Sequence, residues 1–303
     1  MNWKPEREIE IVAGTPPGGG QDRPARTLIK ILQEQRLLAV PMKVSNIVGK
    51  GGGAAWDYLL AHPSDPHVLA INSPPLLTNR LFGISDYDHA ELTPLVNLYT
   101  EYVAFVVRTD STIADAAELK RRLGANPGSV TISLATALGT TNHIAAAQIV
   151  RQAGGDVGAL SIRVFDSARF AVADVIAGNA EVAAVSAVSA APEITEGKLR
   201  PLAVTGPQRL PGIFAAASTL TENAVDCVMG TWRGVLAPAG ISTAQREFWE
   251  QAFAAATRSA EWNSELASQY WVSSFMTGPE YTAFLDRERA SLRTALNELG
   301  LLK

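Results

Sequence analysis

The segment TPPGGGQD, residues 15–22, carries the strongest chemical signal in this chain of 303 residues. It follows an apolar run at residues 9–14 and precedes a segment whose apolar residues have helical spacing. At a strand-to-helix junction of this kind, free backbone N–H groups and the positive end of the helix dipole favour an anion. Similar junctions occur at residues 49–53 and 139–142. Together, the three junctions predict a site for an anion.

The first junction does not fit the usual nucleotide sites. A P-loop needs a lysine and a hydroxyl residue directly after its last glycine, but Gln21 and Asp22 follow Gly20. The sequence has no G-x-G-x-x-G pattern, and Asp22 would repel a pyrophosphate at this helix start. The nucleophile elbow G-x-S-x-G and the zinc pattern H-E-x-x-H do not occur either.

The histidines and the cysteine do not form a catalytic or metal-binding set. The four histidines are scattered at His62, His67, His89 and His143. His143 falls in the first turn of a predicted helix, where a structural hydrogen bond is expected. The lone Cys227 excludes an internal disulfide and is expected to be a small buried side chain. We therefore expect recognition rather than catalysis, with no cofactor and no metal.

Short apolar runs alternate with helix-length segments along the chain, which is typical of a doubly wound α/β fold. The runs are nearly continuous in hydrophobicity, as in parallel strands covered on both faces. The predicted strands are residues 9–14, 68–72, 103–107, 130–135, 199–206 and 234–238.

Several polar residues are predicted to cap helices. Asp22 is expected to cap the helix after the glycine loop. Ser242 with Gln245, and Thr277 with Glu280, have the spacing of a capping box ahead of long amphipathic segments.

Charge and hydropathy indicate which partners and which cellular compartments are to be expected. The chain has 26 basic and 30 acidic residues and a formal net charge of −4, and no Lys/Arg cluster stands out, so we expect no nucleic-acid partner. No apolar stretch approaches the roughly 18 residues of a membrane span. Since MNWKPEREIEIV runs directly into a strand-like segment, no secretory signal is recognised. A cytoplasmic location, or a periplasmic one after removal of a signal, both stay open.

Five segments, in this order, carry a resemblance to a known family: IVAGTPPGGGQDRPAR, VSNIVGKGGGAA, GTTNHIAA, ITEGKLRPLAVTGPQRLPG and TWRGVLAPAGIS. On these segments the chain resembles the extracytoplasmic solute receptors of tripartite tricarboxylate transporters, the Bug receptors. The resemblance implies the type II periplasmic binding protein fold, in which two α/β lobes, each a mainly parallel sheet flanked by helices, hold a ligand in the cleft between them. It implies a monomer without catalysis that passes a small organic carboxylate to membrane transporter subunits.

The resemblance also places the lobes and the site. Lobe one is expected to comprise residues 1–102 plus 230–303 and lobe two residues 103–229. In the family, the glycine loop after the first strand cradles a carboxylate through backbone N–H groups and bridging water. Carried over to this sequence, the ligand-binding residues are Thr15, Pro17, Gly18, Gly19, Gly20, Gln21, Ser73, Thr140, Thr141, Asn142, Asp166, Ser186 and Trp232.

Some positions depart from the family pattern and leave the ligand open. Residues 165–169 read FDSAR where a glycine-containing segment is common, so a candidate cleft loop gains Asp166 and Arg169, which could also pair with each other. A dicarboxylate, a tricarboxylate or an aromatic acid would each fit. Arg233 could meet an anion, or form a salt bridge on the surface or between the lobes.

Two alternatives remain beside the receptor. One is a cytosolic sensor or carrier on the same fold. The other is a lyase or hydrolase acting on an organic acid, with Asp22, Asp166 or His143 as the base, because a fold alone does not fix a function.

Overall fold

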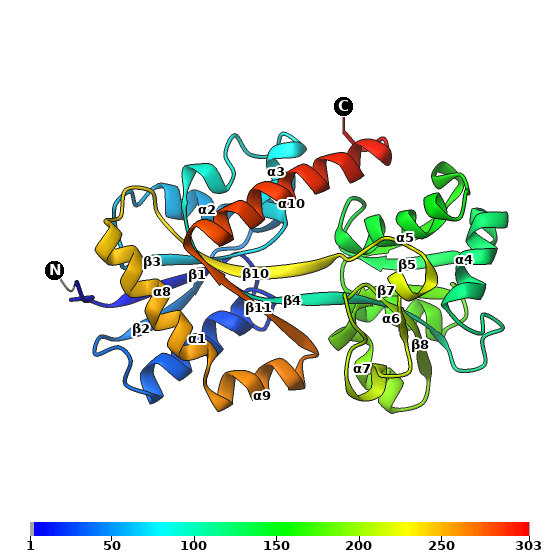
Figure 1. The fold of residues 1–303 in the computed structure, drawn as a ribbon, viewed down its shortest axis with the longest axis horizontal. Helices are drawn as coiled ribbons and strands as arrows, with labels where there is room; N and C mark the ends of the chain where they lie inside the picture. Colours follow the sequence, from blue (N-terminus) through cyan, green and yellow to red (C-terminus); the bar gives the residue numbers. More distant parts are fainter. Residues whose placement is uncertain (1–2, 303) are drawn as a thin grey trace.

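The computed structural model describes residues 3–302 and consists of two lobes side by side (Figure 1). Lobe one holds both ends of the described chain. Its elements are β1 (Ile9–Ala13), α1 (Asp22–Glu34), β2 (Met42–Asn46), α2 (Gly53–Leu60), β3 (Val68–Asn72), α3 (Pro75–Leu81), α8 (Thr243–Thr257), α9 (Ala260–Ser268), β11 (Trp271–Thr277) and α10 (Gly278–Glu298).

Lobe two is formed by the middle of the chain. Its elements are α4 (Ala116–Ala125), β5 (Thr131–Ala135), α5 (Thr141–Gln152), β6 (Ser161–Phe165), α6 (Ala168–Ile176), β7 (Val182–Ser186), α7 (Ala187–Thr195), β8 (Leu199–Val204) and β9 (Ser218–Thr219).

Two strands join the lobes. The long strand β4 (Thr93–Arg108) pairs with β10 (Gly230–Ala237) as far as Tyr102, and from Val103 onward it pairs with β7 and β8. The strand order across the molecule is β2-β1-β3-β10-β4-β7-β5-β6. The predicted two-lobed α/β architecture is confirmed, while the exact lobe boundaries stay a prediction.

The pairing is parallel at the outside of the sheet and antiparallel through its middle. β1 pairs parallel to β2 and β3, and β5 pairs parallel to β6 and β7. β4 and β10 are antiparallel because the chain leaves lobe one on the first and returns on the second. The predicted strands 103–107 and 234–238 are therefore parts of these two crossing strands, and a parallel sheet does not describe them.

Each lobe has its own apolar core. In lobe one, the buried face of α1, including Leu28 and Leu32, packs against β1 and against Trp249 and Phe253 of α8. In lobe two, Phe105 packs with strand and helix residues of β5 and α5. No helix within residues 3–302 has the length and hydropathy needed to cross a membrane.

The capping predictions have different outcomes. Ser242 and Gln245 form the predicted capping box at the start of α8. Thr277 is the N-cap residue of α10, but its side chain makes no capping hydrogen bond, so that capping box is wrong. Asp22 is not the N-cap of α1 either; the N-cap is Gln21, and Asp22 is the first helical residue.

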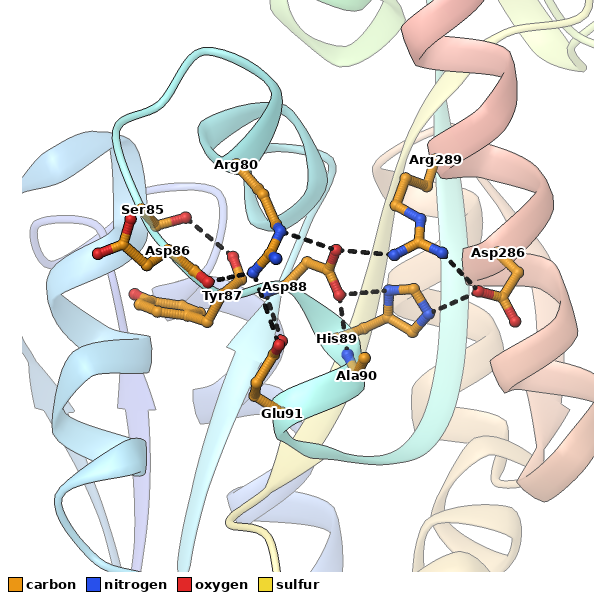
Figure 2. A network of polar contacts seen from close by, with 10 residues as sticks. All are labelled: Arg80, Ser85, Asp86, Tyr87, Asp88, His89, Ala90, Glu91, Asp286 and Arg289. Atoms are coloured by element: carbon orange, nitrogen blue, oxygen red, sulfur yellow. Dashed lines mark hydrogen bonds and ion pairs between the residues drawn. The ribbon is translucent and has the colours of Figure 1, made fainter.

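A polar cluster fixes α10 to the segment that precedes β4 (Figure 2). The buried Asp88 carboxylate accepts a hydrogen bond of 2.9 Å from Arg289 Nη1, and His89 Nε2 lies 3.2 Å from Asp286 Oδ1. Burial raises the pKa of Asp88, but hydrogen bonds from the Ala90 amide and Arg289 outweigh it and the pKa is lowered. Two residues of α10 thus hold this helix on lobe one.

The far end of α10 reaches lobe two. Glu298 Oε1 pairs with Arg151 Nη1 of α5 at 2.9 Å, and Leu296 packs with Ile144 of the same helix. The helix therefore bridges the lobes on the side where Figure 1 shows it running from lobe one toward α5.

Candidate ligand-binding site

The glycine loop and Ser73 meet at one edge of lobe one, because β1 and β3 are parallel and both end there. Gln21 joins them: its Oε1 accepts a hydrogen bond of 2.8 Å from Gly14 N, and its Nε2 donates to Ser73 Oγ at 3.1 Å. The Gln21 and Ser73 side chains are each 3% exposed. Two predicted site residues are therefore brought together, but both use their polar groups to hold the loop.

Asp22 fixes the loop from within instead of capping the helix. Its Oδ2 accepts hydrogen bonds from Gly18 N and Arg26 Nε, both at 2.8 Å, and its Oδ1 accepts one from Asn46 Nδ2 at 2.8 Å. The residue is 1% exposed. Burial raises the pKa of Asp22, but these hydrogen bonds outweigh it, so the pKa is lowered and the ionised form is held.

The glycines allow close contacts that a side chain would block. Gly18 has a φ of +80°, which glycine adopts without strain. A Cβ on Gly19 would lie 2.7 Å from Thr15 Cβ and Oγ1, and one on Gly20 would lie 2.7 Å from Arg233 Nη2. The loop therefore packs tightly on Thr15 on one side and on a guanidinium on the other.

Most amides of the loop already have partners. Gly18 N donates to Asp22, Gly19 N donates to the Pro16 carbonyl at 2.9 Å, and Gln21 N donates to Thr15 Oγ1 at 3.2 Å. Within the described residues, the Gly20 amide has no intramolecular hydrogen bond, and Gly20 is exposed. Pro17, which has no N–H, is also exposed. We predicted several free amides in this loop. Over residues 17–21, only the amide of Gly20 is free to donate a hydrogen bond to a ligand.

The predicted residues of lobe two follow β5, β6 and β7, which are parallel and end at one edge. Thr141 Oγ1 lies 3.1 Å from Thr231 Oγ1 of β10, so the start of α5 touches a crossing strand. Thr140 Oγ1 donates to the Ala137 carbonyl at 2.9 Å and does not cap α5. Asn142 is half-buried in the first turn of this helix.

Asp166 and Ser186 complete this edge in different ways. Ser186 ends β7, and its Oγ lies 2.8 Å from Ser189 Oγ in the first turn of α7. Asp166 is exposed after β6, and so is Arg169. In the part of the chain that the structure describes, no ion pair joins these two side chains, so the suggested pairing is not found.

Trp232 lies apart from the other predicted residues. It is 1% exposed and packs in an apolar cluster with α10, where its ring meets Phe284 edge-on at 5.9 Å. Its Nε1 donates to Glu288 Oε2 at 3.2 Å. Burial raises the pKa of Glu288, against the lowering effect of that hydrogen bond, and the net pKa is raised. The side chain belongs to the core, and a direct ligand contact from it has no support.

The next residue, Arg233, points to the opposite face of β10, because side chains alternate along a strand. Its Nη2 lies 2.8 Å from Glu101 Oε1 of β4, and its Nε donates to the Gly20 carbonyl at 3.0 Å. Burial raises the pKa of Glu101, although the Arg233 charge lowers it, and the net pKa is raised. The expected salt bridge exists, but it joins the two crossing strands.

Sequence reasoning missed Glu101, Thr231 and Asn46. A single charge in the otherwise apolar or neutral run NLYTEYVAFVV would have pointed to Glu101. Asn46 ends β2 and donates to the Thr15 carbonyl at 2.8 Å as well as to Asp22, so it supports the glycine loop. The strand that Asn46 ends was not among the predicted strands, which concealed that role.

Two surface depressions lie on the part of the chain that the structure describes. One depression of about 740 Å³ lies beside α4 and is lined in part by Lys120 and Arg121. Another, of about 600 Å³, lies between α5 and the end of α10, beside His143 and Arg151. Neither includes the glycine loop. Across residues 3–302, no group of three or more His, Cys, Asp or Glu side chains is arranged to hold a metal ion.

Comparison with known proteins agrees with this arrangement. The profile of the tripartite tricarboxylate transporter family receptors matches residues 25–301. BugT of Bordetella pertussis is 27% identical over 241 residues, which cover 78% of this chain and 72% of that protein.

Two solved structures share the fold. One, Rpa4515 of R. palustris with adipate, has a TM-score of 0.82 at 22% identity and covers 98% of this chain and 99% of that one. The other, MatC (Rpa3494) of Rhodopseudomonas palustris with bound malate, has a TM-score of 0.75 at 18% identity and covers 96% and 99% of the two chains.

The fold is that of the two-lobed periplasmic binding proteins, as its similarity to the structure of the periplasmic binding protein BugD also shows. The chain belongs to the tripartite tricarboxylate transporter receptor family, as the profile match over most of its length shows. The resemblance to the Bug receptors is likewise confirmed by the match to BugT.

Proposed function

We propose that this chain is a receptor that binds a small organic carboxylate between its lobes and delivers it to the membrane subunits of a transporter. The observation that carries the proposal is that the glycine loop of lobe one and the start of α5 in lobe two both contact the crossing strand β10. The glycine loop contacts Arg233, and the start of α5 contacts Thr231. These two residues are two positions apart and therefore lie on the same face of the strand. The adipate and malate bound by the two structural relatives supply the ligand class.

The ligand-binding residues in this proposal come from both lobes. Gly20 N offers an open donor from lobe one, and Thr141 at the start of α5 offers a hydroxyl from lobe two. Contacts from both sides favour the closed arrangement, so binding and closure are linked. A receptor that works with membrane subunits in this way belongs in the periplasm, which favours a chain exported across the inner membrane over the cytosolic sensor or carrier.

The enzyme alternative has less support from the candidate bases. Asp22 is buried and holds three donors, so its lowered pKa makes it a weak base. His143 Nδ1 accepts a hydrogen bond of 3.0 Å from Gly139 N, and burial lowers the pKa of this histidine. Both residues organise the start of a helix. Asp166 is exposed, so the enzyme alternative can still be tested at this residue.

A thermal-shift screen tests the proposal. The panel contains adipate, malate, citrate and benzoate, with glucose 6-phosphate and glucose as controls. A ligand at a hundred times its Kd adds about 2.7 kcal/mol of stability, which raises Tm by several degrees. We expect a shift with at least one carboxylate and recovery of that acid unchanged. A chemically converted acid would support the enzyme, and no shift with any acid would contradict the receptor.

A glycine pair then locates the site. Gly19→Ala forces its Cβ against Thr15 and should abolish the carboxylate-dependent shift. Gly128→Ala in lobe two is the matched control, since its Cβ would have 3.4 Å to the nearest atom, the Ala159 carbonyl oxygen. Equal binding by the two variants would remove the glycine loop from the site.

A further inference from the structure

Arg233 and Glu101 form an ion pair at the place where the glycine loop meets the crossing strands. Thr231 is directly opposite Glu101 in the register of β10 and β4, so Arg233 is its diagonal neighbour on the same face. Each side chain of the pair is 12% exposed. Two charges at the junction of the lobes are thus largely removed from solvent, but each keeps a small exposed part.

The guanidinium has hydrogen-bonding capacity left. Arginine carries five N–H donors. Nε donates to the Gly20 carbonyl at 3.0 Å, and Nη1 makes a long contact of 3.4 Å with the Trp232 carbonyl. Nη2 forms an ion pair with Glu101 Oε1 at 2.8 Å, and no hydrogen bond joins them within the described residues. Within residues 3–302, the other N–H groups of the guanidinium donate to no protein group. Two such donors on one guanidinium suit the two oxygens of a carboxylate.

The open amide lies beside this guanidinium. A Cβ on Gly20 would be 2.7 Å from Arg233 Nη2, so the guanidinium packs directly against the residue whose N–H is free. The neighbouring amides at Gly18, Gly19 and Gln21 are used within the loop. An anion attracted to the loop therefore finds one neutral donor and one cation together.

We propose that Arg233 is the cation that anchors the ligand's carboxylate at Gly20, and that Glu101 is a fixed counter-ion that orients Arg233 and limits the strength of anion binding. This inference rests on the proposed carboxylate receptor and adds the residue that supplies the charge. Glu101 acts through Arg233 and is a positioning residue. When the ligand binds, two carboxylates share one guanidinium, so neutralising Glu101 strengthens binding.

A purely structural brace between β4 and β10 would predict the opposite behaviour. Such a pair would stabilise the crossing strands, and the charge of Glu101 would not alter the affinity for an anion. Removing Arg233 alone would leave Glu101 buried without a partner and endanger folding. The useful variants are therefore Glu101→Gln and the neutral pair Glu101→Gln/Arg233→Gln, which differ only at Arg233.

Isothermal titration calorimetry measures the affinity of each variant for the acid that gives the largest thermal shift. We expect Glu101→Gln to bind it about threefold tighter or more, since a like charge has been removed nearby. The double variant should bind about tenfold weaker or more than Glu101→Gln, the loss of a charge-assisted contact. Adding salt should weaken binding to Glu101→Gln more than to the double variant.

Arg23→Gln is the matched control. Arg23 is also near the start of α1 and also pairs with a glutamate, Glu265, at 2.7 Å, but it has no contact with Gly20. Its loss should leave the affinity within about twofold of the wild type. Similar affinities for Glu101→Gln and the double variant would overturn the role of Arg233 and leave the carboxylate receptor standing. Failure of every acid to bind the wild type would overturn the receptor, and the role of Arg233 with it.

Discussion

The edges of the two lobes that carry the predicted residues are built differently. In lobe one, Gln21 and Asp22 are buried, and hydrogen bonds fix the loop to Gly14 after β1, to Ser73 after β3 and to Asn46 at the end of β2. In lobe two, residues 136–138, Asp166 and Arg169 are exposed. The lobe-one edge is held by buried polar side chains, while the lobe-two edge exposes Asp166, Arg169 and the turn at residues 136–138 to solvent.

Under the proposed function, this difference predicts a division of work between the lobes. A fixed loop loses little conformational entropy on binding, so lobe one can supply affinity from a prepared surface. The exposed groups of lobe two are desolvated only when the lobes close on a ligand, which makes them suited to distinguishing one acid from another. Substitutions in lobe one should therefore affect folding and binding together, and those in lobe two mainly selectivity.

Among substitutions at the two edges, the largest expected effect is that of Asp22→Ala. It leaves Gly18 N and Asn46 Nδ2 without their acceptor, and we expect about 1–3 kcal/mol of destabilisation together with loss of binding. Asp166→Ala in lobe two should change stability by less than about 0.5 kcal/mol. Urea unfolding of both variants checks this. Equal destabilisation by the two would remove the contrast between the edges.

The pH dependence of stability should reveal Asp22 on the acid side. Because its folded-state pKa is lowered, its contribution is fully present above the unfolded value near pH 4 and is lost as the pH falls through the folded value. The stability difference between wild type and Asp22→Asn should therefore shrink below about pH 4. Unfolding curves from pH 6 down to pH 3 measure it, and a constant difference would contradict the prediction.

A smaller effect is expected at the contact between α5 and β10. Thr141→Val removes the hydroxyl that meets Thr231 but keeps the shape of the side chain. We expect about 0.5–1.5 kcal/mol less stability and a changed ranking among the acids of the panel. Thermal shifts with each acid report both. An unchanged ranking would show that this hydroxyl serves only the contact with β10.

The smallest effect is expected from loss of the ion pair between α10 and lobe two. Arg151→Gln breaks the partly exposed pair with Glu298, and such pairs contribute about 0–1 kcal/mol. Stability should change by less than about 0.5 kcal/mol if the apolar contact of Leu296 with Ile144 holds the helix there. A Leu296→Ala variant should cost about 2–5 kcal/mol. A larger loss of stability in Arg151→Gln than in Leu296→Ala would show that the ion pair, and not the apolar contact, holds α10 on lobe two.

The sequence predicted the parts of the fold that depend on local pattern. The run at residues 9–14, the glycine loop and the apolar face of α1 were identified because strand, turn and helix each leave a clear signal. β4 was predicted only over residues 103–107, since Asn97, Thr100 and Glu101 interrupt the apolar pattern in its first half. Those polar residues lie where the strand crosses between the lobes.

The site was harder to predict because it depends on contacts between distant segments. Asp22 was expected to cap a helix, but the structure gives its carboxylate to Gly18 and Asn46. Trp232 and Arg233 are adjacent in a motif, yet alternation along β10 sends one into the core and the other toward the glycine loop. Which of the two side chains faces the loop depends on how β10 is aligned with β4. The sequence motif gives no information about that alignment.

Hydrogen exchange followed by mass spectrometry, with and without the acid that binds most tightly, tests the division between the edges most directly. Without ligand, the hydrogen-bonded amides of residues 18, 19, 21 and 22 should exchange slowly, and the unpaired amides of Gly20, Leu138 and Thr140 rapidly. With ligand, the gain in protection should be larger at residues 136–142, as the exposed edge closes on a carboxylate already held at the glycine loop. A gain confined to residues 15–22, or none at either edge, would contradict a ligand held between the two lobes.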